Sequence, residues 1–233
     1  MPILCRINAS DDIEGGQTIQ DAAAVAAYLV EECGVNALHV SRAVHVHDEF
    51  MWAPGAVHGG FSAPLVEEIK RAVDVPIITV GRYTEPQYAE LLVREGRIDL
   101  VAFGRQSLAD PEMPNKAKNG NLDSMTPCIG CLLGCVPYMF RGEPITCALN
   151  PECGREAEIV PADKQKKVVV VGGGPGGLYA ARICAQRGHQ VTLLERGDEL
   201  GGNFRLAAFP ADKGDLTSAI RSYIVRARSR CHH

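Results

Sequence analysis

The chain has 233 residues, a formal net charge of −4 and 46% hydrophobic residues, which gives length for one or two domains with sizeable cores. Without a block of basic residues, we expect neither nucleic acid nor an anionic membrane surface as a partner. No apolar run reaches the length of a membrane span, the first residues lack the features of a signal peptide, and the cysteine usage suits a reducing cytoplasm.

The first half of the sequence alternates apolar runs of strand length with stretches that carry apolar residues at helical spacing. The predicted strands are residues 3–8, 37–41, 75–80 and 100–103, and the predicted helices are 19–33, 62–73, 85–95 and 110–121. Alternation at this period indicates parallel β/α units. The connection at 42–61 is long enough to predict a functional loop.

Two of the predicted strands end in the same dipeptide, Gly81-Arg82 and Gly104-Arg105. Glycine exposes backbone N–H groups at a strand end, and arginine can reach an anion. In β/α barrels the loops after the last two strands commonly build a phosphate site. A solvated turn is the alternative for each copy, but two copies at matched strand ends favour a phosphate site.

Cys128, Cys131, Cys135 and Cys147 follow a C-x2-C-x3-C-x11-C pattern, with three thiols inside eight residues. Such a loop can present several sulfurs to one compact centre, and an iron–sulfur cluster is the favoured occupant. Structural zinc, which more often uses two separated C-x2-C knuckles, and four unligated cysteines remain the alternatives. The other cysteines are scattered singly at Cys5, Cys33, Cys153, Cys184 and Cys231.

A glycine-rich loop, residues 172–177, stands inside a predicted strand–helix–strand unit. The strands are predicted at 166–171 and 190–195, and the helix at 178–187. In the G-x-G-x-x-G pattern, Gly172 serves the tight turn, Gly174 lets the backbone approach a pyrophosphate and Gly177 allows close helix–strand packing. Glu195 ends the second strand, where it can accept from a ribose hydroxyl and repel a 2′-phosphate. These features predict a dinucleotide-binding fold.

A β/α body with a phosphate site, a cysteine loop and a dinucleotide fold, in this order, resembles the 2,4-dienoyl-CoA reductase branch of the old yellow enzyme family, the NADH:flavin oxidoreductases. The likeness rests on Arg6 and on residues 80–82, 102–105, 108–111, 127–131, 135, 147, 150–151, 172–177 and 195–202. It runs over nearly the whole chain. The cysteine spacing is similar to that of the reductases rather than to that of trimethylamine dehydrogenase.

The resemblance implies that Gly81, Arg82, Gly104 and Arg105 hold the phosphate of FMN and that Arg6 faces the N1/O2 edge of its flavin. It also implies that the four cysteines ligate a 4Fe–4S cluster. Electrons would pass from NAD(P)H through FAD and the cluster to FMN, which would reduce an activated C=C bond of a small unsaturated substrate.

The same likeness assigns the glycine loop and the residues after the second strand to FAD rather than to NAD. The implied FAD residues are Gly172, Gly174, Pro175, Gly177, Glu195, Arg196, Gly201 and Gly202. The residues that bind and protonate the substrate would lie in barrel strands that this sequence does not contain, so the catalytic residues are unknown.

The family barrel has eight strands, and the four predicted here resemble the last four. We therefore expect an α/β chain with three parts: residues 1–115 as the C-terminal half of an FMN-binding (β/α)8 barrel, 116–165 as the iron–sulfur segment and linker, and 166–233 as the truncated start of a Rossmann-like FAD domain that ends in a tail from residue 204. We expect such a chain to be an internal piece of a larger enzyme or a truncated reading frame. Alone it should be inactive, and either unstable or self-associating through its exposed half-barrel.

Two other functions remain in play. The chain could be a non-catalytic electron-transfer or cofactor-binding subunit that partner chains complete. It could instead be a scaffold in which the four thiols bind zinc, and a colourless, zinc-containing protein would distinguish this alternative from the iron–sulfur one.

Overall fold

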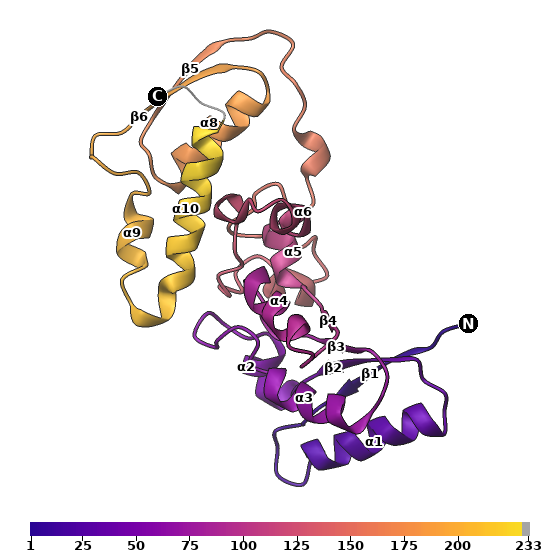
Figure 1. Ribbon diagram of the computed structural model, residues 1–233. Coiled ribbons are helices and arrows are strands. Elements are labelled where there is room, and N and C mark those ends of the chain that lie inside the picture. The colour runs from indigo at the N-terminus through magenta and orange to yellow at the C-terminus, as the bar shows by residue number, and fades with distance from the viewer. Residues whose placement is uncertain (230–233) are drawn as a thin grey trace. The chain divides into compact units, whose positions relative to one another are not determined.

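A computed structural model describes residues 1–229 and divides into two compact units (Figure 1). The first runs from Met1 to Gln106, and the second begins at Ser107. Cys231 lies outside the described residues. The α/β class is confirmed, with a partial barrel followed by a Rossmann-like segment. The functional division at 115 and 165 stays a prediction, since the cysteine segment and the dinucleotide fold share the second unit.

The first unit is built on a four-stranded parallel sheet with the strand order β1-β2-β3-β4. The strands are β1 (Leu4–Asn8), β2 (Ala37–Ser41), β3 (Ile77–Thr79) and β4 (Leu100–Val101). Arg6 is paired with His39, and His39 with Ile78, so these three side chains project from the same face of the sheet. The predicted alternation of strands and helices is therefore observed.

Helices cover the other face of this sheet (Figure 1). They are α1 (Ile19–Glu31), α3 (Ala63–Ala72) and α4 (Pro86–Arg94), while the long connection holds a 3-10 turn (His45–His47) and α2 (Asp48–Met51). Thr18 caps α1 by accepting from the backbone N–H of Asp21, whose carboxylate accepts from Thr18 in return. Leu38, Val40 and Ile77 pack with apolar residues of these helices in the first core.

The sheet face that carries Arg6 stays open to solvent in this unit. Leu4 and Leu100 on this face are 57% and 50% exposed, and Arg6 is exposed as well. Exposed leucines beside an unpaired strand edge favour association with a further surface. Self-association of the chain remains a prediction.

The second unit contains the expected strand–helix–strand order. The parallel strands β5 (Lys167–Val171) and β6 (Gln190–Leu194) pair in register, and α8 (Pro175–Gln186) connects them. The helix begins at Pro175, three residues earlier than predicted, because Gly174 is its N-cap and proline is favourable in the first turn.

The prediction of a tail from residue 204 is wrong for its described part. Residues 203–228 form two helices, α9 (Asn203–Ala207) and α10 (Gly214–Arg228). The buried apolar residues of α10 recur at helical spacing: Ala219, Ile220, Tyr223 and Ala227. Tyr223 and Ala227 of this stripe pack against α8 in one cluster with Leu178.

The cysteine segment has little regular structure, as predicted. The elements around it are α5 (Arg105–Ala109), α6 (Met113–Lys118), α7 (Val136–Phe140) and 3-10 turns at Leu122–Ser124 and Glu156–Glu158. The predicted helix at 110–121 is thus shorter, and α7 was not expected. No helix within residues 1–229 is long and apolar enough to cross a membrane.

Ile77→Ala should lower the free energy of unfolding of the first unit by about 2–5 kcal/mol, because Ile77 is fully buried under the helices. Ile78→Ala, on the open face of the same strand, should cost on the order of 1 kcal/mol. Trp52, the single tryptophan, lies in the first unit and reports its unfolding in urea by fluorescence. Equal losses in the two variants would contradict the assignment of the two faces.

Candidate functional site

The two Gly-Arg pairs lie at the same edge of the first sheet. Gly81-Arg82 follows β3 and Gly104-Arg105 follows β4, and these parallel strands are neighbours. Arg82 has a positive φ of 51°, an uncommon backbone conformation for a residue with a side chain. Its Nη1 donates to the carbonyl oxygen of Val57 at 2.8 Å, which ties the long connection to this edge.

Arg105 carries the clearest sign of a ligand at this edge. Its Nη1 is buried and has no hydrogen-bond partner within the described residues. A buried guanidinium nitrogen without an acceptor is costly, and a phosphate oxygen would satisfy it. The residues at this edge therefore fit the predicted phosphate group.

Arg6 and His39 form a polar pair on the open face of the sheet. Burial and the neighbouring Arg6 cation lower the pKa of His39 below its usual value, so its imidazole is neutral at pH 7. His39 Nε2 is buried and lacks a hydrogen-bond partner among the described residues. His39 was not among the residues predicted from the sequence, although strand alternation across paired β1 and β2 could have placed it beside Arg6.

The predicted dinucleotide residues converge at the carboxyl ends of β5 and β6. The backbone N–H of Gly173 donates to Glu195 Oε2 at 2.6 Å, and that of Gly197 donates to Glu195 Oε1 at 2.8 Å. These donors, Gly197 first, lower the pKa of the Glu195 carboxyl and keep it charged at neutral pH. Gly201 N–H donates to the Gly173 carbonyl oxygen at 2.8 Å, so the glycine loop, the acid and the second glycine pair form one site.

Close backbone approach explains the last glycine of the loop. A Cβ on Gly177 would overlap the carbonyl oxygen of Gly172, whereas a Cβ on Gly176 would meet no atom within 4 Å. A Cβ on Gly202 would lie 3.1 Å from Gly174 Cα, so the second glycine pair borders the loop. Arg196, also predicted to bind FAD, is exposed beside Glu195.

The four predicted metal ligands belong to one partly buried segment. Burial first, and then the nearby charges of Cys128 and Cys131, raise the pKa of the Cys147 thiol to about 11. Thr146 N–H donates to the Gly134 carbonyl oxygen at 2.8 Å, which brings the chain before Cys147 beside the chain before Cys135. A Cβ on Gly134 would lie 2.7 Å from the Thr146 carbonyl oxygen, so this approach requires glycine.

These four cysteines are free thiols. Within residues 1–229, no three His, Cys, Asp or Glu side chains meet in a geometry that could hold a metal ion. A set of four thiols is nevertheless the donor chemistry that an iron–sulfur cluster or zinc requires. The metal ligands therefore remain a prediction that the donor set fits.

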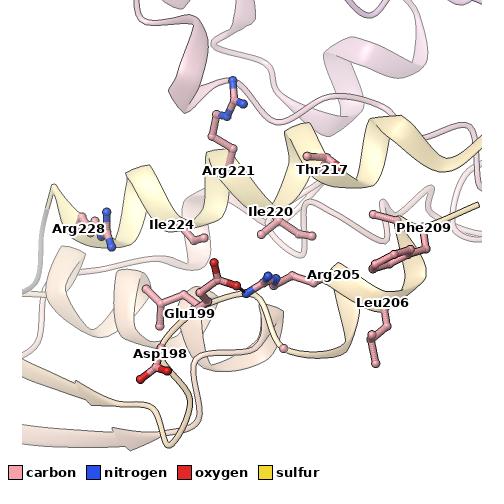
Figure 2. A pocket seen from close by; sticks show the side chains of 13 residues that line it. Asp198, Glu199, Arg205, Leu206, Phe209, Thr217, Ile220, Arg221, Ile224 and Arg228 are labelled. Carbon is pink, nitrogen blue, oxygen red and sulfur yellow. Dashed lines mark ion pairs between the residues drawn. The ribbon is translucent and has the colours of Figure 1, made fainter. Parts of the chain in front are cut away.

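A groove of about 760 Å³ lies between α9 and α10 and includes Gly202 in its lining (Figure 2). Glu199 and Arg205 form an ion pair within it. Phe209, also in the lining, is 84% exposed. The groove thus borders the dinucleotide site, and no sequence signal had marked it.

The order of a partial β/α barrel and a dinucleotide-binding fold along the chain matches the order of two known family models. Residues 1–124 match the model of the NADH:flavin oxidoreductase / NADH oxidase family, and residues 170–220 match a model of the NAD(P)-binding Rossmann-like domain. The chain belongs to the NADH:flavin oxidoreductase / NADH oxidase family. The resemblance inferred from the sequence is confirmed.

Similar proteins include reductases and oxidases. An NADH oxidase of Thermoanaerobacter brockii is 42% identical over 92% of this chain and 34% of its own length. A cinnamate reductase of Clostridium sporogenes is 38% identical over 90% of this chain and 32% of its own length. A solved 2-naphthoyl-CoA reductase in complex with 2-naphthoyl-CoA superposes with a TM-score of 0.90 at 32% identity, over 96% of this chain and 34% of that one. The chain thus spans about a third of the length of these relatives.

Gly177→Ala should destabilise the second unit by about 1–3 kcal/mol, because the added methyl group overlaps the Gly172 carbonyl oxygen. Gly176→Ala should leave the stability of the second unit unchanged or raise it. The added methyl group meets no atom within 4 Å, and alanine is a better helix former than glycine at this position of α8. Thermal unfolding followed by circular dichroism compares the two. Trp52 fluorescence should change in neither variant at temperatures below the transition, and a loss of stability in Gly176→Ala alone would refute the packing.

Proposed function

We propose that this chain carries the FMN phosphate site, the 4Fe–4S cluster and the first part of the FAD site of an NAD(P)H-dependent flavin oxidoreductase. The complete enzyme would reduce an activated C=C bond in a small unsaturated substrate. The observation that carries the proposal is the succession in one chain of an orphaned buried arginine nitrogen at a Gly-Arg edge, a segment with four free thiols and a glycine loop tied to an acid. The similarity to a cinnamate reductase and to a 2-naphthoyl-CoA reductase supports a conjugated substrate.

At the first site, Arg82 and Arg105 would neutralise the phosphate of FMN, and Arg105 Nη1 would gain the acceptor it lacks. Arg6 would place its cation beside the N1/O2 edge of the flavin, where it favours negative charge. When bound, the flavins supply hydride and single-electron transfer and the cluster supplies single-electron transfer.

At the second site, the charged Glu195 would accept a hydrogen bond from a ribose hydroxyl of FAD and repel a ribose 2′-phosphate. The N–H groups at the start of α8 would face the pyrophosphate, with Gly174 and Pro175 at the helix start. Four thiols that bind a metal centre have to stay reduced, which supports a reducing, cytoplasmic location for the enzyme.

Anaerobic addition of iron and sulfide to the purified chain should give a brown protein with about four irons per chain. Cys147→Ser should lower the iron content and bleach the visible absorption. Cys153→Ser is the matched control, because Cys153 is a buried cysteine nearby that is not a predicted ligand. A colourless protein with about one zinc per chain would exclude the electron relay and support the zinc scaffold.

Arg105→Gln should weaken FMN binding by about tenfold or more, as expected for loss of a charge-assisted hydrogen bond of about 1.5–3 kcal/mol. Quenching of flavin fluorescence during titration measures the affinity. Arg71→Gln, which removes an exposed arginine of α3, is the control. Riboflavin, which lacks the phosphate, should bind both variants alike, and an equal loss for riboflavin would place Arg105 away from the phosphate.

A further inference from the structure

The cysteine segment has little regular structure, yet both of its ends are buried. Thr126 stands two residues before Cys128, and Leu149 stands two residues after Cys147; both are buried in the second unit. Buried backbone outside helices and sheets requires hydrogen-bond partners from elsewhere. The partners of these two ends identify what holds the candidate metal site in place.

One helix supplies side-chain contacts to both ends. Arg226 Nη1 donates to Thr126 Oγ1 at 2.9 Å, and the hydroxyl of Ser222 lies 3.2 Å from the same oxygen. The Tyr223 hydroxyl donates to the Leu149 carbonyl oxygen at 2.7 Å. These three residues of α10 lie within about one turn of helix, so one patch of α10 reaches the start and the end of the cysteine segment.

The same region contains a cluster of charges in which two members are buried and three are half-buried. Asp110 accepts from the backbone N–H of Thr126 at 2.8 Å and from Lys116 Nζ at 2.6 Å. Glu152 pairs with Arg182 of α8. The fifth charged member is Arg226, whose pKa is lowered chiefly by burial and then by the cation of Arg182.

This charge cluster holds three cations, Lys116, Arg182 and Arg226, and two carboxylates. An excess buried cation is costly unless an anion lies close by. The candidate anion is the thiolate-bound centre, because Arg226 contacts Thr126, two residues before Cys128, and Tyr223 contacts Leu149, two residues after Cys147.

We propose that Arg226 is a positioning residue of the cysteine site, which fixes the start of the segment through Thr126 and whose half-buried charge stabilises the anionic centre that the thiolates bind. The inference rests on the proposed 4Fe–4S cluster. A thiolate-ligated cluster is anionic, and its one-electron reduction by an external reductant adds one negative charge. A buried cation nearby therefore raises the reduction potential.

Redox titration of the reconstituted 233-residue chain, with the reduced cluster measured by electron paramagnetic resonance, tests the effect of the charge. In Arg226→Gln the ratio of reduced to oxidised cluster at a fixed solution potential should fall about tenfold. This corresponds to a reduction potential lower by about 59 mV for a one-electron couple. Arg226→Lys should keep most of the wild-type potential because it keeps the cation. Arg221→Gln, an exposed arginine on the same helix, should match wild type. A potential in Arg226→Gln equal to that of Arg221→Gln would overturn the proposal.

Hydrogen–deuterium exchange of the metal-free chain tests the positioning without a cluster. Arg226→Gln should accelerate exchange around residues 126–131 relative to Arg221→Gln, and unchanged exchange would refute the holding role of α10. If Arg226→Gln does not fold, Thr126→Val takes its place in the experiment. It removes the hydroxyl that accepts from Arg226 but keeps Arg226 itself, and it should accelerate exchange around residues 126–131 in the same way. A wild-type chain that binds no iron would overturn the proposed function and the effect on potential, while the exchange result would still decide the positioning.

Discussion

A parallel pair of strands needs a crossover connection, and the helix in that crossover covers one face of the sheet. This constraint governs both units of the chain. It brings the carboxyl ends of β3 and β4 to one edge, where the two Gly-Arg pairs meet, and it places the glycine loop beside Glu195 at the ends of β5 and β6. It also leaves the opposite face of the first sheet open, and that face carries Arg6 and His39.

The cysteine segment depends on a different kind of interaction. Few of its residues belong to a helix or strand, so its position follows from side-chain contacts at its ends and from Gly134, which admits the Thr146 backbone. Thr126 and Leu149 are held by hydrogen bonds from α10. Such a segment can keep several thiols partly exposed, because its buried polar groups are satisfied away from the sulfurs.

Local patterns predicted most of the fold. Apolar runs and helical spacing located the first-unit strands and helices because each of these elements buries one face. The glycine loop and Glu195 were predicted because their positions follow from the turn between one strand and one helix. The structure brings these residues together as the sequence had suggested, through hydrogen bonds that involve Gly173 and Gly201.

The sequence did not predict α10 or its contacts. The buried stripe of α10 was present at helical spacing, but the interpretation of residues 204–233 as a tail passed over it. Arg226 shows the physical limit of sequence reasoning. An isolated arginine normally projects into solvent, and its partner Thr126 lies 100 residues earlier in the chain, so no local pattern links them.

The contact of α8 with α10 bears on electron transfer between the two candidate sites of the second unit, the dinucleotide loop and the cysteine segment. The dinucleotide loop opens directly into α8, and α8 packs on α10 through Leu178 and Tyr223. Because α10 also holds Thr126 and Leu149, the same packed pair of helices supports the glycine loop and the cysteine segment. Their separation is therefore set by side-chain packing rather than by the irregular linker between them. Single-electron transfer between two bound centres requires a fixed distance between them. Because the contact of α8 with α10 sets this distance, we include it in the proposed relay.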